Sequence, residues 1–396
     1  MSISTEVITE PQRVGDLERA WEELLERASV SDPTLSPIWQ KIWWDVFGPL
    51  DGRRLRVIAL REGSRLVGVA PFLLRRHYYV PGVPVRRLEL LASGEAQSDE
   101  IMSEYNGVIA ERGREVEVAR AAVAALRSPE IGTWDELVMP VLSPDNPMTY
   151  AFHRALEAAG HPSELEAQTS AFYIALPGTW EAYLAQLSSP SRYLVKRTLR
   201  DLDAWAGGEV AFEVVHDRAA FDVGRAILRD LHAQRWEKEV GPGGVFGSRR
   251  FTEFHDRAMR WLLDRGGLEL AWLSARGQPI AALYNFVWGD KVYQYQGGRR
   301  MDLPKSIRAG IAVNVYAIQH AIERGRREYD FLGGDDRYKD QLSTAKRPLL
   351  RIRATRGPLT HLARRCAERT AAGARDVQRR LQALRARVSS APTPRP

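Results

Sequence analysis

A tyrosine and a lysine follow an apolar segment that ends in two glycines, Gly333 and Gly334. Ligands tend to bind where strands end in α/β folds, and glycines there permit unusual backbone dihedral angles. Tyr338 could donate a proton to a leaving thiolate, and Lys339 could neutralise developing negative charge. A polar turn with the tyrosine packed on a sheet accounts for the same residues equally well.

A second candidate stretch begins at Lys305 and Ser306, where a helix is expected to follow a strand. A helix N-terminus offers unpaired N–H donors and the positive end of a dipole, which suits a pyrophosphate. Ser306 is predicted to cap the helix, and Arg308 adds positive charge. The small residues Gly310 and Ala312 would let a ligand approach the backbone. An ordinary capped helix, with a glycine for packing, is the alternative interpretation.

Two further groups are weaker candidates. His232 and Trp236 are four residues apart on a predicted helix and share a face, so they could line a substrate pocket. A buried tryptophan and a surface histidine would show the same spacing. Asp99 follows an expected strand over residues 87–91 and could orient or deprotonate an amine. An exposed aspartate in a loop is the more common arrangement.

The sequence motifs of several large enzyme classes are absent from these 396 residues. The single cysteine, Cys366, allows neither an intrachain disulfide nor a cysteine-rich metal site, and the eight histidines form no HExxH motif. There is no P-loop, no strand-linked GxGxxG and no GxSxG motif. We therefore expect no metal. The polar N-terminus and the lack of an apolar run of about 18 residues lead us to expect a cytoplasmic protein.

The net charge of +7 belongs to the C-terminal tail. Residues 358–396 hold nine arginines and two acids, which leaves 48 basic and 48 acidic residues in the rest of the chain. A balanced body argues against a nucleic-acid-binding surface. The tail can be drawn as an amphipathic helix over residues 361–388, which could contact a membrane surface or an acidic partner. A solvated helix or a frayed end is the alternative, and the Pro-rich segment from Ser389 is expected to be disordered.

The order β-β-β-α-β is predicted twice, about 200 residues apart. Each copy opens with a hairpin whose turn contains a glycine, Gly63 in the first copy and Gly277 in the second. The predicted hairpins span residues 55–75 and 268–288, and the helices and closing strands that follow span 111–126 and 136–140 in the first copy and 306–324 and 328–332 in the second. We therefore predict two α/β domains, over residues 1–165 and 166–357, and a tail over 358–396.

These stretches, in this order, resemble the CelD-like acetyltransferases of the GNAT superfamily, whose architecture is related to the tandem domains of Fem peptidyltransferases. The resemblance is best from Leu176 to Gly357. It includes Leu176-Pro177-Gly178-Thr179-Trp180, Leu231-His232 with Arg235-Trp236, Gln278-Pro279-Ile280, Tyr293-Gln294-Tyr295 with Gly297, Ser306 with Gly310, Tyr329-Asp330-Phe331-Leu332-Gly333-Gly334 and Tyr338-Lys339. The first half is a weaker match, through Trp39, Trp43, Pro71-Phe72 and Asp99. The resemblance implies tandem GNAT-like domains, each a mixed, mostly antiparallel sheet flanked by helices.

The resemblance also implies a mechanism. An acyl-CoA, acetyl-CoA or another, would lie along the second sheet with its pyrophosphate near Ser306, Arg308, Gly310 and Ala312. An amine would attack the thioester directly, and a backbone N–H near Gln296 or Gly297 would hold the oxyanion. Tyr338 would lie close to the position at which GNAT enzymes place the tyrosine that protonates the thiolate. By position, Lys339 and Asp99 match the lysine and aspartate that Fem proteins place near the acceptor, and Tyr295 joins His232 and Trp236 as a candidate for substrate binding.

One departure from the family pattern leaves the donor open. GNAT phosphate loops usually read Gln/Arg-x-x-Gly-x-Gly/Ala, but here Ile307 stands three residues before Gly310, and Arg308 is one place off. The expected function is acyl transfer from an acyl-CoA to a small-molecule or sugar amine. The alternatives are a Fem-like transferase that uses aminoacyl-tRNA, for which alone a nucleic acid would be a partner, and a non-catalytic scaffold in envelope polysaccharide synthesis.

Overall fold

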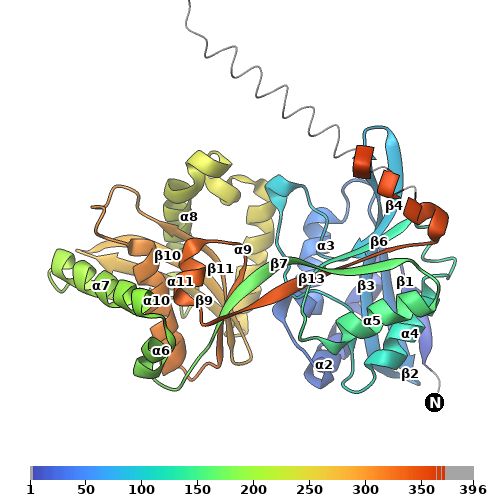
Figure 1. Ribbon diagram of the computed structural model, residues 1–396, viewed down its shortest axis with the longest axis horizontal. Helices are drawn as coiled ribbons and strands as arrows, with labels where there is room; N and C mark the ends of the chain where they lie inside the picture. Colours follow the sequence, from blue (N-terminus) through green and yellow to red (C-terminus); the bar gives the residue numbers. More distant parts are fainter. Residues whose placement is uncertain (1–2, 363, 367, 371–396) are drawn as a thin grey trace, which may run out of the picture.

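One sheet of 13 strands runs through the described part of the chain, residues 3–362, 364–366 and 368–370, in the computed structural model of Figure 1. Its strand order is β1-β2-β3-β4-β6-β13-β7-β12-β11-β10-β9-β8, and β5 pairs with β3. The strands are β1 (Ser4–Ile8), β2 (Arg54–Glu62), β3 (Arg65–Val80), β4 (Val83–Leu90), β5 (Ile109–Ala110), β6 (Glu136–Leu142), β7 (Ser163–Ala175), β8 (Val210–Val214), β9 (Leu268–Ala275), β10 (Gln278–Trp288), β11 (Lys291–Arg299), β12 (Glu328–Gly333) and β13 (Ala345–Thr355).

Helices cover both faces of this sheet (Figure 1). They are α1 (Pro11–Gly15), α2 (Glu18–Arg27), α3 (Pro37–Phe47), α4 (Glu115–Ala125), α5 (Pro147–Ala158), α6 (Trp180–Gln186), α7 (Ser189–Ala206), α8 (Arg218–Val240), α9 (Arg249–Asp264), α10 (Ala309–Glu323) and α11 (Arg337–Leu342), with the short 3-10 turns η1 (Pro33–Leu35), η2 (Gln97–Asp99) and η3 (Gly244–Gly247). Residues 358–362, 364–366 and 368–370 are also helical and are called the terminal helix below. The rest of the predicted tail lies outside the described residues.

The repeated order predicted from the sequence is confirmed. The first copy is β2-β3-β4-α4-β6 and the second is β9-β10-β11-α10-β12. In each copy the first three strands are antiparallel and the crossover helix makes the third and fourth strands parallel. The hairpin turns require left-handed backbone, which Gly63 (φ 60°) and Gly277 (φ 72°) adopt without strain. The mixed, mostly antiparallel sheet flanked by helices is the predicted fold class.

The last strand within the described residues returns to the first half of the sheet. β13 lies between β6 and β7 and is antiparallel to both. The predicted domain boundary at residues 165/166 falls inside β7, which pairs with β13 on one edge and β12 on the other. Because the sheet is continuous across this point, the division into two domains stays a prediction.

The two halves also share an apolar core on one face of the sheet. Trp39 of α3 meets Phe254 of α9 edge to face, with ring centroids 4.9 Å apart. Phe251 and Phe254, from the second half, are fully buried in the cluster that α2 and α3 form over the first half. This packing fixes the position of the first half against the strands of the second half.

Helix α10 begins later than predicted. Its first residue is Ala309, Arg308 occupies the N-cap position, and no side chain caps the helix. Ser306 is exposed and is not the N-cap, because Pro304 to Ile307 form a turn in which the Ile307 N–H donates to the Pro304 carbonyl at 2.8 Å. The prediction that Ser306 caps this helix is therefore wrong.

We expect Gly298→Ala to destabilise the protein strongly. A Cβ atom at Gly298 would lie 2.2 Å from the backbone nitrogen of His232, because α8 packs directly on β11 at this point. Relief requires a shift of the helix backbone, so we expect a loss of about 2 to 3 kcal/mol of unfolding free energy. At the adjacent Gly297, a Cβ would lie 3.1 Å from a Leu283 side-chain methyl and 3.3 Å from the Ala282 carbonyl oxygen, which a small adjustment can accommodate, so Gly297→Ala is the matched control. Urea unfolding of both variants tests this, and equal midpoints would contradict it.

Candidate functional site

The parallel strands β11 and β12 separate shortly after they begin. They pair only at Lys291 with Glu328, Val292 with Tyr329, and Tyr293 with Asp330. Beyond Tyr293, the edge of β11 that faces β12 has no strand partner among the described residues, so its backbone N–H and C=O groups are free to meet a ligand. A cleft of about 710 Å³ opens between the two strands.

A β-bulge lies in the wall of this cleft. The pairing of β10 with β11 shifts between Tyr284 and Asn285, which leaves Tyr295 as an extra residue between Gln294 and Gln296. Bulges redirect the local backbone and are frequent next to active sites. The Tyr295 hydroxyl donates to the Ile101 carbonyl of the first half and lies 3.0 Å from His255 Nε2. The bulge is thus held from both halves of the molecule.

Tyr338 lies at the inner end of the cleft, at the start of α11. Its hydroxyl donates to Gln294 Oε1 at 2.9 Å. Burial raises the pKa of Tyr338 well above its usual value, so the hydroxyl keeps its proton at neutral pH. Because Tyr338 and Gln294 both line the cleft, this proton is available to a leaving group bound there.

The first half contributes a buried carboxyl group to the same cleft. Glu104 is 4% exposed, and burial raises its pKa to about 7. Its Oε1 accepts from the Gly333 N–H at 3.4 Å, and the charge of Lys339 opposes the rise in pKa. The Lys339 ammonium donates to the Gly333 carbonyl, and burial lowers the pKa of Lys339. A carboxyl group that titrates near neutral pH in a cleft is suited to general base catalysis.

Glu104 was missed by the sequence analysis. It stands in a loop beside Tyr105-Asn106-Gly107, with no motif around it, and Met102 and Tyr105 on either side adopt left-handed backbone at φ 50° and 65°. Non-glycine residues rarely adopt this conformation, which marks the loop as specially constrained. Only the fold shows that this loop reaches the end of β12.

The outer part of the cleft is rich in basic side chains, three of which also pair with acids outside the lining: Arg235 with Glu239, Arg300 with Asp302 and Arg308 with Asp201. Five basic side chains line it, whereas the acids in the lining are Glu104 and Asp336. The basic residues are Arg235, Arg299, Arg300, Lys305 and Arg308. Arg235 also lies over the ring of Trp236, 4.2 Å from its centroid. This charge distribution favours an anionic ligand that enters past the start of α10.

Most of the predicted site residues meet in this cleft. Those that line it are Tyr338, Lys339, Gln296, Gly297, Arg308, Gly310, Trp236 and Tyr295. Ser306 is not in the lining, although its neighbours Lys305 and Ile307 are. Gly297 and Gly310, which the sequence analysis assigned to binding of the donor, thus line the same open cleft.

Besides Ser306, three predicted residues do not line the cleft. Ala312 is fully buried against the sheet, on the face of α10 that packs into the core, so it cannot contact a ligand. His232 is 1% exposed and lies under Gly244 and Phe246 of the α8–α9 connection. Asp99 accepts from the Ser248 hydroxyl at 2.7 Å and pairs with Arg250, and so ties η2 to the start of α9.

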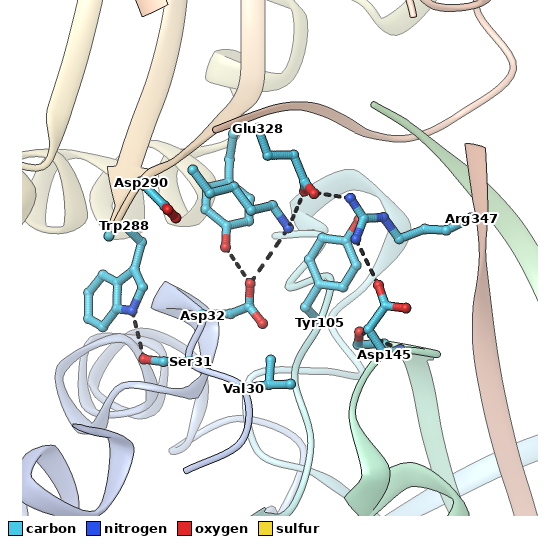
Figure 2. A pocket seen from close by; sticks show the side chains of 13 residues that line it. Val30, Ser31, Asp32, Tyr105, Asp145, Trp288, Asp290, Glu328 and Arg347 are labelled. Carbon is cyan, nitrogen blue, oxygen red and sulfur yellow. Dashed lines mark hydrogen bonds and ion pairs between the residues drawn. The ribbon is translucent and has the colours of Figure 1, made fainter. Parts of the chain in front are cut away.

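A second, smaller pocket of about 340 Å³ lies at the opposite end of β11 and β12, where the two halves meet (Figure 2). Lys291 is at its centre, with its ammonium 3.0 Å from Asp330, 3.1 Å from Glu328 and 3.8 Å from Asp32. Arg347 pairs with Glu328 and with Asp145. Burial raises the pKa of Asp32. The charged groups of this pocket are largely paired with one another, which indicates that they join the two halves.

The described residues were also considered for membrane-spanning helices and for metal sites. None of the helices described is both long and apolar enough to cross a membrane. Within the same residues, no cluster of three or more histidine, cysteine or acidic side chains is arranged to hold a metal ion.

Among the comparisons with known proteins, the match to a family model lies in the second half of the chain. A family model described as an acetyltransferase (GNAT) domain matches residues 189–340. No curated protein matches the chain.

Solved structures share the whole architecture at low sequence identity. FemX is 12% identical, with a TM-score of 0.58 over 91% of this chain and 99% of its own. A conserved protein of unknown function from Bacteroides thetaiotaomicron is 10% identical, with a TM-score of 0.51 over 88% of this chain and 99% of its own. The C-terminal domain of a putative lysylphosphatidylglycerol synthetase from Agrobacterium fabrum is 11% identical, with a TM-score of 0.50 over 88% of this chain and 95% of its own.

At these identities the likeness concerns the fold alone. None of these matches is to the CelD-like family, so that finer assignment stays a prediction. Residues 189–340 match the GNAT acetyltransferase domain, and the chain as a whole shares its fold with FemX.

Proposed function

We propose that this protein transfers an acyl group from an acyl-CoA to an amine. The observation that carries the proposal is the cleft between β11 and β12, which is cationic at its outer part and holds Tyr338 and Glu104 at its inner end. A long donor with phosphates at one end and a thioester at the other fits that distribution of charge. The match of residues 189–340 to the GNAT domain supports the same chemistry.

Each group in the cleft has a defined task in the proposed reaction. The amine nitrogen attacks the thioester carbonyl carbon, and the Glu104 carboxylate accepts the proton that the nitrogen loses. A backbone N–H at Gln296 or Gly297 stabilises the oxyanion. As the C–S bond breaks, the Tyr338 hydroxyl gives its proton to the sulfur and is later reprotonated from solvent. Lys339 lies beside Glu104 and stabilises its charged form.

An aminoacyl-tRNA donor is the second candidate, because a cationic cleft also suits a nucleic acid and FemX shares the fold. Extended phosphate contacts would make tRNA binding fall steeply with salt. The balanced charge of residues 1–357 favours the smaller donor. Absent or salt-insensitive tRNA binding would remove this candidate.

We expect CoA to raise the melting temperature of the protein and Gly310→Glu to abolish that rise. Gly310 is in the first turn of α10 and lines the cleft, with Arg299 Cδ 3.0 Å from where its Cβ would lie. A carboxylate there would fill the space and repel a phosphate. At 100 times Kd a ligand stabilises the folded state by about 2.7 kcal/mol, which a melting experiment detects.

Gly15→Glu is the matched control for this experiment. Gly15 is exposed at the end of α1, and nothing lies within 4 Å of its Cβ position. This variant should keep the full response to CoA. If millimolar CoA leaves the melting temperature of the wild-type protein unchanged, the acyl-CoA proposal is wrong.

A further inference from the structure

The terminal helix turns an apolar face to solvent. Leu359, Leu362 and Cys366 are spaced three and four residues apart, so they lie on one face. Leu359 is 84% exposed and Leu362 is 62% exposed, the two most exposed large apolar residues described, and Cys366 is exposed as well. Neighbouring leucines that are mostly exposed are uncommon on a surface that contacts only water.

The opposite face of the same helix is tied to the sheet. Arg364 is 5% exposed and donates to Glu164 of β7 at 2.8 Å. Glu368 pairs with Arg353 of β13 and lies 3.7 Å from Arg364. These partly buried ion pairs fix the rotation of the helix about its axis, so the leucines cannot turn inward without breaking them.

Positive charge borders the exposed leucines. Arg365 and Arg369 follow Leu362 by three and seven residues and thus lie beside it on the helix surface. Both are exposed, and neither forms an ion pair with another described residue. Residues 371–396 of the sequence add six arginines and one acid, Asp376.

A second exposed apolar group lies at the same end of the molecule. Figure 1 shows the terminal helix (red) beside the hairpin of β3 and β4, and Arg353, which binds Glu368, also donates to the Tyr79 hydroxyl of β3 at 2.8 Å. Near the tip of this hairpin, Tyr78 is 51% and Val83 is 59% exposed. Exposed apolar side chains from the terminal helix and from the β3–β4 hairpin therefore lie at the same end of the molecule.

We propose that this end of the protein docks on a membrane surface rich in anionic lipids. Leucine side chains on a basic amphipathic helix insert at the boundary between headgroups and acyl chains, while the arginines contact lipid phosphates. A bilayer can accept apolar groups from two separate elements at once, whereas an acidic protein would have to match both. This proposal does not depend on the proposed acyl transfer.

The test is co-sedimentation of the full chain with vesicles of phosphatidylglycerol and phosphatidylcholine in equal parts, compared with vesicles of phosphatidylcholine alone. We expect binding to the anionic vesicles, weakened by salt. Leu359→Asp/Leu362→Asp should weaken it at least about tenfold, because two apolar contacts are lost. The matched control is Val116→Asp/Val223→Asp, which changes valines that are 54% and 55% exposed on α4 and α8.

A second variant keeps the test decisive if the leucine variant proves unstable. Arg365→Glu/Arg369→Glu should abolish the preference for anionic vesicles and leave the melting temperature unchanged, because both arginines are exposed. Wild-type binding that is absent at low salt, or that survives both double variants, would overturn the proposal. Equal competition by soluble polyglutamate at the same charge would also overturn it, because the partner would then be any polyanion, such as an acidic protein.

Discussion

Glu104→Gln is expected to lower kcat for acyl transfer by about 10²- to 10⁴-fold, the range that a lost general base costs. The amide keeps the size of the side chain and can still accept from the Gly333 N–H, so the loop that carries it should stay in place. What the variant loses is the group that accepts the proton of the attacking amine. Release of free CoA thiol at saturating acceptor measures the effect.

The pH profile separates a base from a merely structural residue. Burial raises the pKa of Glu104 to about 7, so the carboxylate form increases as the pH rises through that value. The wild-type rate should therefore increase as the pH rises to about 7 and level off above it, to the extent that ionisation of Glu104 controls the rate. Glu104→Gln, with the same acceptor, should lack this increase.

Asp99→Asn is the matched control, because Asp99 is the acid that sequence position favoured and it lies outside the cleft. It should retain kcat within a few-fold. CoA should protect both variants from thermal unfolding as it protects the wild type. If Asp99→Asn lost kcat and Glu104→Gln kept it, the assignment of the base would be reversed.

The parts of the fold that are encoded locally could be predicted. The hairpin over residues 268–288 reads as two apolar runs with a left-handed turn at Arg276 and Gly277 between them, and no distant residue is needed to recognise it. The strand that leads into Gly333, and the positions of Tyr338 and Lys339 after it, could also be predicted from the neighbouring residues alone. Helix α10 was misplaced by three residues because a serine is a common N-cap, whereas the turn that begins at Pro304 has no equally strong local signal.

The parts that depend on distant pairing could not be predicted. The segment of β13 lies inside the predicted second domain, and its local sequence does not show that it pairs with β6, about 210 residues away, as well as with β7. Glu104 and Gly333 meet for the same reason: they are 229 residues apart and only the shared sheet brings them together. Asp99 stands five residues before Glu104, so the prediction chose the right region and the wrong acid.

One buried carboxylate connects the junction of the halves with the cleft. Asp330 is fully buried in β12, and its Oδ2 accepts from the Tyr105 hydroxyl of the first half at 2.6 Å and lies 3.0 Å from the Lys291 ammonium. Its Oδ1 accepts from the N–H of Leu332 at 2.7 Å, a residue with φ 59°. Tyr105 follows Glu104, and Leu332 precedes Gly333. Asp330 therefore holds both segments that bring Glu104 and Lys339 together.

We expect Asp330→Asn to cost about 3 to 5 kcal/mol of unfolding free energy, as for other buried ion pairs that lose one partner. Asparagine can still accept from Leu332, but its amide turns N–H donors toward Lys291, whose ammonium lies 4.2 Å from the ring centroid of Tyr105 and 4.3 Å from that of Tyr293. Urea unfolding measures this loss. Turnover of the folded variant should also fall, because the strained backbone at Leu332 loses its charged acceptor.

Asp32→Asn is the matched comparison, because Asp32 is a buried acid of the same pocket. Burial raises the pKa of Asp32 above its usual value, so the folded state binds a proton more readily than the unfolded state, and the carboxylate form of Asp32 opposes folding as the pH rises above about 4. A neutral asparagine should therefore cost much less at position 32 than at position 330. The difference should grow in favour of Asp32→Asn as the pH rises above about 4, and should stop growing once Asp32 is ionised in the folded state as well. Equal losses at the two positions would show that Asp330 is one of several interchangeable charges at the junction.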